Sequence, residues 1–343
     1  MNPYALTMIV LSLISGTALT LSGYHWLTTW IGLEINTLAI IPLMTKTPHP
    51  RAVESATKYF LTQAMASAML MFSSTINAWI TGEWTIASTS EIPAILLTVA
   101  VAIKLGIAPF HFWLPEVMQG LPIEVGFILT TWQKLAPMTV LIQLAPFTNL
   151  YLTLLLGLTS IVIGGWSGIN QTQIRKILAY SSIAHLGWMT AILTISPHLT
   201  LINFYLYILM TSTLFITIMS MNTKNISDLS ISWSKSPILT SLSLLTLLSL
   251  SGLPPLTGFI PKWLIAQEMV KQDLTLLVLL MLLSTLLSLF FYLRLTYILS
   301  LTLAPNLTFS PIPWMNTKKN FYSPLIVASL LLLPLTPLIT LFI

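Results

Sequence analysis

The chain has 343 residues, of which 55% are hydrophobic and only 7% are charged. Soluble domains carry about 25% charged residues, so this composition excludes an ordinary water-soluble domain and predicts a membrane protein. The absence of cysteine excludes thiolate-held iron–sulfur clusters, Cys-type zinc sites and disulfides. The net charge of +5 does not indicate a nucleic-acid partner, because the Lys and Arg residues form no basic cluster.

Apolar segments of about 20 residues can each cross a bilayer as a helix. Eleven candidates lie between breaks of proline, glycine or charge: 3–22, 25–44, 55–78, 92–109, 123–144, 149–168, 174–195, 199–220, 237–270, 274–300 and 323–342. The first lacks the basic start and cleavage site of a signal peptide, so we expect a retained helix. The predicted fold class is an all-α polytopic membrane protein with about eleven transmembrane helices.

Two of these segments contain glycine and proline where a helix would lie at membrane depth, at 104–109 and 252–258. We therefore interpret the ninth segment as one broken helix, and Pro137 predicts another local distortion in the fifth. Irregular backbone at this depth is tolerated only where it is buried in protein or lines a wet cavity, and transporters use it at their sites.

A weak internal repeat accompanies these breaks. Shifting the chain by about 146 residues places Pro109 over Pro255 and the first five helices over the next five. Inverted repeats with an odd number of helices are typical of transporters. The predicted organisation is a five-helix half over 1–145, a second over 146–302, and a loop with a C-terminal transmembrane helix over 303–343.

Positive charge is distributed unevenly between the two predicted sides of the membrane. The loops after even-numbered helices hold Lys46, Arg51, Lys224, Lys235, Lys318 and Lys319, and Arg175 and Lys176 begin the seventh helix on the same side. The opposite loops hold Lys271 alone. The positive-inside rule places the N-terminus on the cytoplasm-like or matrix side and the C-terminus on the other.

A few ionisable residues remain inside the apolar segments. Glu34 lies in the second helix, Lys104 in the fourth, Lys134 in the fifth, His185 in the seventh and Lys262 after the break in the ninth. A charge at mid-bilayer costs about 2.5–3.5 kcal/mol on insertion scales, so each must face the interior. Burial disfavours the ammonium form of a lysine and a nearby carboxylate favours it, so such a set can take up and release protons, which arginine cannot.

Structural interpretations of the charged residues stay open. A buried Glu–Lys pair can serve only to fix helix register, and His185 can simply bond to a neighbouring helix. Arg294, Lys58 and Lys271 lie near helix ends, where long side chains extend to the interface. For His111, Glu116 and Glu124, a solvated loop is the favoured interpretation. The histidines lack metal-site spacing and no nucleotide-binding motif is present, so we expect no metal or cofactor on this chain.

Several motifs are similar to those of the antiporter-like membrane subunits of respiratory complex I. They are the runs from Lys104 to Glu116 (KLGIAPFHFWLPE), from Trp132 to Pro137 (WQKLAP), from Gln173 to Gly187 (QIRKILAYSSIAHLG) and from Ser251 to Trp263 (SGLPPLTGFIPKW). The resemblance covers essentially the whole chain.

The resemblance implies a pair of inverted five-helix half-channels in which broken helices carry the key lysines. It implies that Glu34 pairs with Lys104, that Lys134 is the central relay, that Lys262 is the outlet, and that His185 bridges the hydrophilic axis through water. The bacterial pattern has fourteen helices and this chain lacks the first three, which leaves a flank for accessory subunits or lipids, cardiolipin included.

The resemblance also implies where the chain works. We expect a subunit of a proton-translocating NADH:ubiquinone oxidoreductase in the mitochondrial inner membrane, with its N-terminus in the matrix and its C-terminus in the intermembrane space. Its partners would be other membrane-arm subunits, including antiporter-like ones. NADH, FMN, iron–sulfur clusters and ubiquinone would bind other subunits, so no redox site is expected here.

The other interpretations are a free-standing cation/proton antiporter, which would use the same lysines, and a structural membrane spacer with inert ion pairs. An enzyme with its own substrate site is least favoured, because the sequence shows no nucleophile–base set.

Overall fold

The protein is described by a computed structural model, which covers residues 2–46, 49–254, 256–301 and 323–331. Over these residues the regular structure is helical, and β-pairing is limited to two isolated bridges, His25 with Thr85 and Gln173 with Asn225. Helices satisfy all their backbone hydrogen bonds within one segment, which the interior of a membrane requires. The polytopic, all-α fold class predicted from the composition is therefore confirmed.

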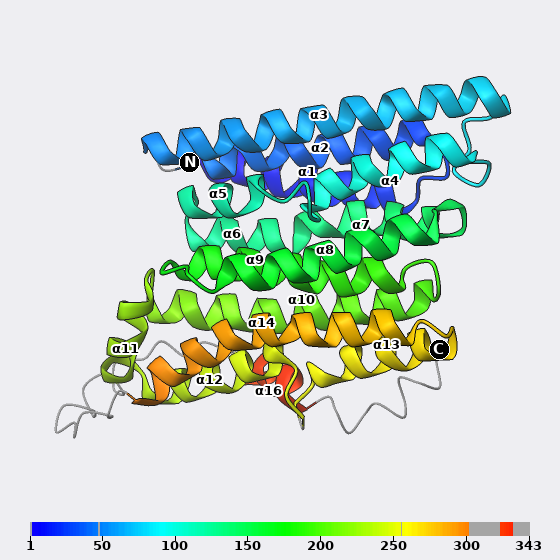
Figure 1. Cartoon of the computed structure of the whole chain (residues 1–343). Helices are drawn as coiled ribbons and strands as arrows, with labels where there is room; N and C mark the ends of the chain where they lie inside the picture. Colours follow the sequence, from blue (N-terminus) through cyan, green and yellow to red (C-terminus); the bar gives the residue numbers. More distant parts are fainter. Residues whose placement is uncertain (1, 47–48, 255, 302–322, 332–343) are drawn as a thin grey trace. The chain divides into compact units, whose positions relative to one another are not determined.

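The chain divides into two compact units, each described here by itself (Figure 1). The first unit comprises residues 1–160 and 190–197. It contains α1 (Pro3–Leu21), α2 (Trp26–Met44), α3 (Pro50–Thr81), α4 (Glu91–Leu105), α5 (Trp113–Gly120), α6 (Ile123–Thr130), α7 (Trp132–Leu144), the short 3-10 helix η1 (Ala145–Phe147) and the first part of α8 (Leu150–Gly168). Within it, α3 packs against α2, α4 and α5, and α7 packs against α1, α2 and α4.

The second unit comprises residues 161–189 and 198–343. It contains the rest of α8, most of α9 (Ile174–Ile192) and of α10 (Pro197–Met221), and then α11 (Ile226–Lys235), α12 (Pro237–Ser251), α13 (Phe259–Lys271), α14 (Thr275–Leu301) and α16 (Ser323–Leu331). In this unit α12 packs against α11, α14 and α16, and α13 packs against α14.

Within the described ranges, six helical segments are long and apolar enough to cross a membrane: Pro3–Leu21, Trp26–Met44, Ile123–Phe147, Leu150–Gly168, Pro197–Met221 and Thr275–Leu301. The number of eleven crossings and the position of the termini stay predictions. Of the predicted C-terminal segment 323–342, the part over 323–331 is helical and the remainder lies outside the described residues, as do Lys318 and Lys319.

Both predicted helix breaks are present. The helix predicted over 92–109 ends at Leu105, and the one predicted over 237–270 is divided into α12 and α13. Gly106 and Gly252 end α4 and α12 with φ of 76° and 81°, a left-handed conformation that costs other L-residues energy. Each glycine turns the chain at the point where the proline-containing segment begins.

The distortion expected in the fifth segment lies before Pro137 and not at it. Helix α7 runs through Pro137, and the interruption falls at Thr131, between α6 and α7. The carbonyl of Phe127 there accepts bonds from the Thr131 N–H, at 3.1 Å, and from its hydroxyl, at 2.7 Å. The helix is thus interrupted three residues before Lys134, not three residues after it.

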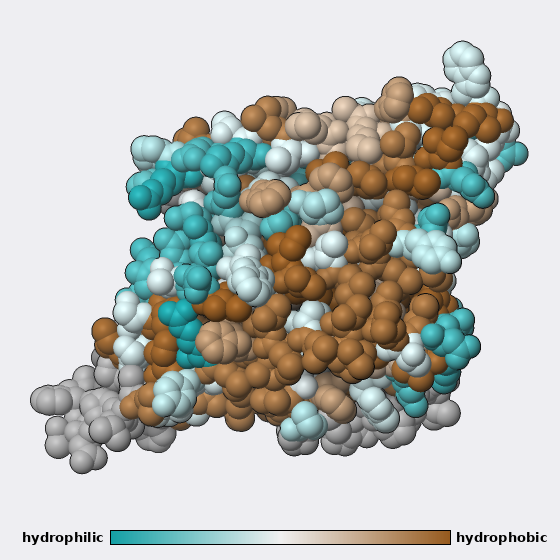
Figure 2. All heavy atoms as spheres, in the orientation of Figure 1, coloured by the Kyte–Doolittle hydropathy of each residue, from teal (hydrophilic) through white to brown (hydrophobic). Residues whose placement is uncertain are grey.

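The interior contains many hydroxyl groups that are satisfied within their own helices. For example, the hydroxyls of buried Ser73, Thr213 and Thr246 donate to carbonyls three residues earlier at 2.7–2.9 Å. Such bonds allow Ser and Thr in an apolar interior without an interhelical partner. Figure 2 shows hydrophobic side chains over α14 of the second unit, and hydrophilic side chains where α3 of the first unit begins.

Candidate functional site

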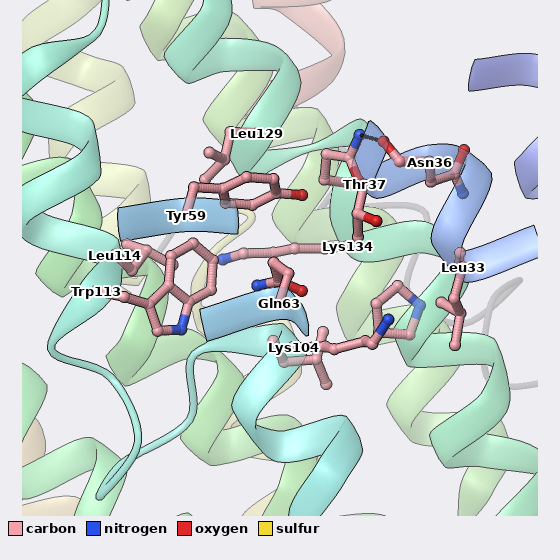
Figure 3. A pocket seen from close by; sticks show the side chains of 14 residues that line it. Leu33, Asn36, Thr37, Tyr59, Gln63, Lys104, Trp113, Leu114, Leu129 and Lys134 are labelled. Atoms are coloured by element: carbon pink, nitrogen blue, oxygen red, sulfur yellow. Dashed lines mark hydrogen bonds between the residues drawn. The ribbon is translucent and has the colours of Figure 1, made fainter. Parts of the chain in front are cut away.

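A small cavity in the first unit brings two predicted site residues together (Figure 3). Lys104 from α4 and Lys134 from α7 both line it, and they are only 5% and 3% exposed. The remaining lining residues are Leu33, Asn36, Thr37, Tyr59, Gln63, Leu105, Trp113, Leu114, Leu129, Gln133, Ala136 and Pro137. Lys104 and Lys134, which are distant in sequence, therefore line the same small cavity.

Lys104 lies in the last turn of α4, immediately before the break at Gly106. The C-terminal end of a helix carries partial negative charge, which favours a nearby cation. The Lys104 ammonium group is buried and has no hydrogen-bond partner among the described residues. Its position at a helix end beside a cavity, with its hydrogen-bonding capacity unused, suits a group that exchanges protons.

Glu34 lies on α2 at the edge of this site. Its carboxylate interacts electrostatically with Lys104 and with Tyr59. The Thr37 hydroxyl is 2.9 Å from Glu34 Oε2 and also 2.9 Å from the Glu34 carbonyl oxygen. Glu34 is half-buried and does not line the cavity itself, whereas Thr37 does. The pairing of Glu34 with Lys104 that the resemblance implies is therefore an electrostatic interaction. Thr37 bonds to the Glu34 carboxylate and itself lines the cavity.

Lys134 lies in the first turn of α7, directly after the interruption at Thr131. In Figure 3 its side chain extends between Tyr59 and Gln63 of α3, towards Trp113. Trp113 follows the break after α4, and its indole N–H donates to the carbonyl oxygen of Ile103 at 3.0 Å. Both lysines are thus positioned next to interrupted backbone.

The other two predicted residues lie together in the second unit. A smaller cavity there is lined by His185 of α9, Lys262 of α13 and Tyr292 of α14, among others. The half-buried Lys262 donates to the carbonyl oxygen of Ser251 at 2.6 Å, across the break between α12 and α13. His185 is 8% exposed, and the centroid of its ring lies 5.7 Å from that of the Tyr207 ring. Lys262 therefore binds the end of the broken helix.

The charged residues assigned to helix ends have structural contacts. Lys58 bonds to Glu54 at 2.8 Å and to Glu116 at 2.7 Å, and all three side chains are largely exposed. Lys271 is paired with Glu268, and Arg294 donates to the carbonyl oxygen of Ile169 at 2.8 Å. The solvated-loop interpretation is wrong for His111, which is only 4% exposed. Glu116 and Glu124 are exposed as expected, but they lie in the first turns of α5 and α6 and not in a loop.

Sequence reasoning missed the neutral polar residues of the first cavity. Asn36, Thr37, Tyr59 and Gln63 are buried there. A signal was available, since Gln63 is an amide within a long apolar segment, and Asn36 and Thr37 follow Glu34 within one helical turn. Neutral polar residues are common in membrane helices, so composition did not distinguish them.

The chain matches two family models. The model described as NADH:quinone oxidoreductase/Mrp antiporter, TM, matches residues 23–288, and the model described as NADH dehydrogenase subunit 2 C-terminus matches residues 289–340. Together they account for nearly the whole chain.

Similar proteins and structures agree with these matches. The NADH-ubiquinone oxidoreductase chain 2 of Aquarana catesbeiana is 56% identical over 98% of both chains, and that of Squalus acanthias is 57% identical over 99% of both. A chain of respiratory complex I from Thermus thermophilus with bound aureothin is similar with a TM-score of 0.83, at 28% identity, over 97% of this chain and 80% of that one.

A chain of the Mrp complex from Dietzia sp. DQ12-45-1b has the same fold, with a TM-score of 0.74 at 16% identity over 84% of this chain and 59% of that one. The matches over nearly the full length, at more than half identity, decide the family. This chain belongs to the NADH-ubiquinone oxidoreductase chain 2 family, within the NADH:quinone oxidoreductase/Mrp antiporter membrane proteins.

Proposed function

We propose that this chain is a membrane-arm subunit of the proton-translocating NADH:ubiquinone oxidoreductase, and that it carries protons through Glu34, Lys104, Lys134, His185 and Lys262. The observation that carries the proposal is the cavity of the first unit, which encloses two buried lysines at two helix interruptions. The relatives named as chains of that enzyme, which match over nearly the full length, support the assignment.

The chemistry follows from the properties of a buried lysine. Its ammonium form is disfavoured by desolvation and favoured by a nearby carboxylate, so a change in that balance makes the group take up or release a proton. In the first unit Glu34 supplies the carboxylate and Lys104 the amine. Lys134, which lines the same cavity, is the next proton acceptor. Glu34 and Lys104 form the entry pair and Lys134 is the relay.

In the second unit, Lys262 and His185 line one cavity. A lysine ammonium that donates to the Ser251 carbonyl would lose that bond if the residue moved, which links its protonation to the geometry of the break. His185 can accept a proton on one ring nitrogen while the other donates. We assign Lys262 to the outlet and His185 to the connection with it.

The finer organisation belongs to the same proposal. Gly106 and Gly252 lie 146 residues apart and share the left-handed conformation, which supports two related halves over 1–145 and 146–302 followed by a C-terminal helix. We propose eleven crossings of the mitochondrial inner membrane, with the N-terminus on the matrix side. Neighbouring membrane-arm subunits and lipids, cardiolipin included, would cover the outer helices, while NADH, FMN, iron–sulfur clusters and ubiquinone bind other subunits.

Lys134→Met tests the proposal because methionine fills similar space and cannot carry a proton. In the assembled complex reconstituted in vesicles, we expect NADH-driven proton pumping to fall by roughly 100-fold, the lower range of the general acid–base contribution. The matched control is Lys271→Met, since Lys271 lies at the surface in an ion pair with Glu268. Unchanged pumping in an assembled Lys134→Met complex would instead favour the structural spacer.

A free-standing antiporter is the second candidate, favoured only by the shared fold with the Mrp chain. It predicts cation/proton exchange by the isolated chain without NADH. The matches to chain 2 proteins favour the subunit.

A further inference from the structure

We propose that Gln63 is a positioning residue of the proton path, whose amide holds the water that connects Lys104 to Lys134. The inference rests on the proposed function and adds a residue to it. Gln63 lies on α3, the helix that packs against α2, α4 and α5, and it is 4% exposed.

The cavity has room for water. About 20 Å³ of it is open to the centres of water molecules, which exceeds the roughly 10–15 Å³ that a single water needs. A buried water also needs two to four polar partners, because an apolar void of similar size stays dry. The polar atoms of the lining therefore decide whether it is hydrated.

Lys104 Nζ and Gln63 Nε2 are buried polar atoms of the lining with no hydrogen-bond partner among the described residues. The amide of Asn36 also has none there, but in Figure 3 it points away from both residues, and its oxygen lies next to Gly16 of α1. Lys104 and Gln63 come from α4 and α3 and are 5% and 4% exposed. Buried polar groups of folded proteins are almost always hydrogen-bonded. Two helices contributing such groups to one cavity of sufficient size therefore indicate bound water.

Gln63 has the right chemistry and place for a connecting group. In Figure 3 its amide lies between the side chain of Lys134 and that of Lys104. An amide both accepts and donates hydrogen bonds, whereas a lysine ammonium only donates. Gln63 can thus bind water or an ammonium on its oxygen and donate from its nitrogen, and it remains neutral throughout.

Neutrality matters because ionisable groups already surround the site. Lys104, Lys134 and Tyr59 line the cavity, and the Glu34 carboxylate interacts with both Lys104 and Tyr59. A fixed carboxylate at position 63 would bind one ammonium permanently. An amide keeps a hydrogen-bonded connection without fixing the charge on either lysine.

The test compares Gln63→Met with Gln63→Asn in the assembled, reconstituted complex. Methionine keeps the length of the side chain but removes its hydrogen bonds, and we expect NADH-driven proton pumping per complex to fall at least about tenfold. Asparagine keeps the neutral amide with its donor and acceptor on a side chain one methylene shorter, and is expected to pump several times faster than methionine at that position. Gln267→Leu, at an exposed position of α13, is the control for loss of an amide.

The outcomes separate this inference from the proposed function. If Lys134→Met loses pumping while Gln63→Met pumps within about twofold of the unmodified complex, only the role of Gln63 is overturned. Retained pumping in Lys134→Met overturns the proposed function. Equal losses in Gln63→Met and Gln63→Asn indicate a packing role and also overturn the inference.

A second measurement does not depend on the variants being assembled. In a high-resolution density map of the unmodified complex, we expect an ordered water within hydrogen-bond distance of Gln63 Nε2 and of Lys104 Nζ. A cavity without such density, at a resolution where other buried waters are visible, overturns the proposal.

Discussion

Trp113 donates its indole N–H to the carbonyl oxygen of Ile103 at 3.0 Å, so a residue after the break binds the last turn of the helix before it. The same ring packs edge-on against Tyr59 of α3, with centroids 5.7 Å apart. Lys104 is the next residue after Ile103. The bond therefore fixes the helix end that carries the buried lysine.

Trp113→Phe should loosen this end. Phenylalanine retains an aromatic ring but removes the donor, and a hydrogen bond of this kind stabilises by about 0.5–1.5 kcal/mol. We expect a lower temperature of inactivation for the assembled complex, together with reduced pumping. Trp79→Phe is the control, since Trp79 is 91% exposed. Equal effects of the two substitutions would show that the bond to Ile103 has no role.

Thr37→Val should weaken the influence of Glu34 on the cavity. Valine has nearly the shape of threonine but no hydroxyl, so the 2.9 Å bond to Glu34 Oε2 is lost. We expect pumping to fall by about 10- to 100-fold, in the range of one hydrogen bond to a charged group. Thr37→Ser, which keeps the hydroxyl, should restore most of it. A serine variant as impaired as the valine variant would contradict the assignment.

Gly252→Ala should affect Lys262 directly. The φ of 81° makes any side chain costly here, by about 1–2 kcal/mol. A Cβ atom would also lie 2.7 Å from Lys262 Nζ and must displace it from the Ser251 carbonyl.

Gly82→Ala is the matched control for Gly252→Ala, because Gly82 has a φ of 76° and nothing within 4 Å of an added Cβ. Both variants should lose stability, measured as the inactivation temperature, but only Gly252→Ala should lose pumping per assembled complex. Equal pumping by the two variants would mean that the position of Lys262 does not matter.

Glu116→Gln should have little effect, although Glu116 belongs to a motif shared with the family. Its carboxylate forms a largely exposed ion pair with Lys58, and such pairs contribute little to stability. We expect pumping within about twofold of the unmodified complex, in contrast with Lys104→Met, which should lose it. The measurement is pumping by both variants side by side, and a large loss in Glu116→Gln would place that residue in the proton path.

The sequence by itself determined the class of the protein and the residues worth testing. Apolar segments with few charges specify membrane helices because unpaired backbone and charge are costly in hydrocarbon. For the same reason Glu34, Lys104, Lys134, His185 and Lys262 could be identified from their positions alone. The breaks at 104–109 and 252–258 were predictable too, since glycine and proline act locally on the backbone.

Only the tertiary structure decided which of these residues share a cavity and what else lines it. The interruption at Thr131 instead of Pro137, the burial of His111 and the position of Gln63 between two lysines depend on contacts between helices that are distant in sequence. Helical periodicity indicates that a residue can face the interior, but not which side chain it meets there. That information comes from packing, because the neighbours of a buried group are supplied by other helices.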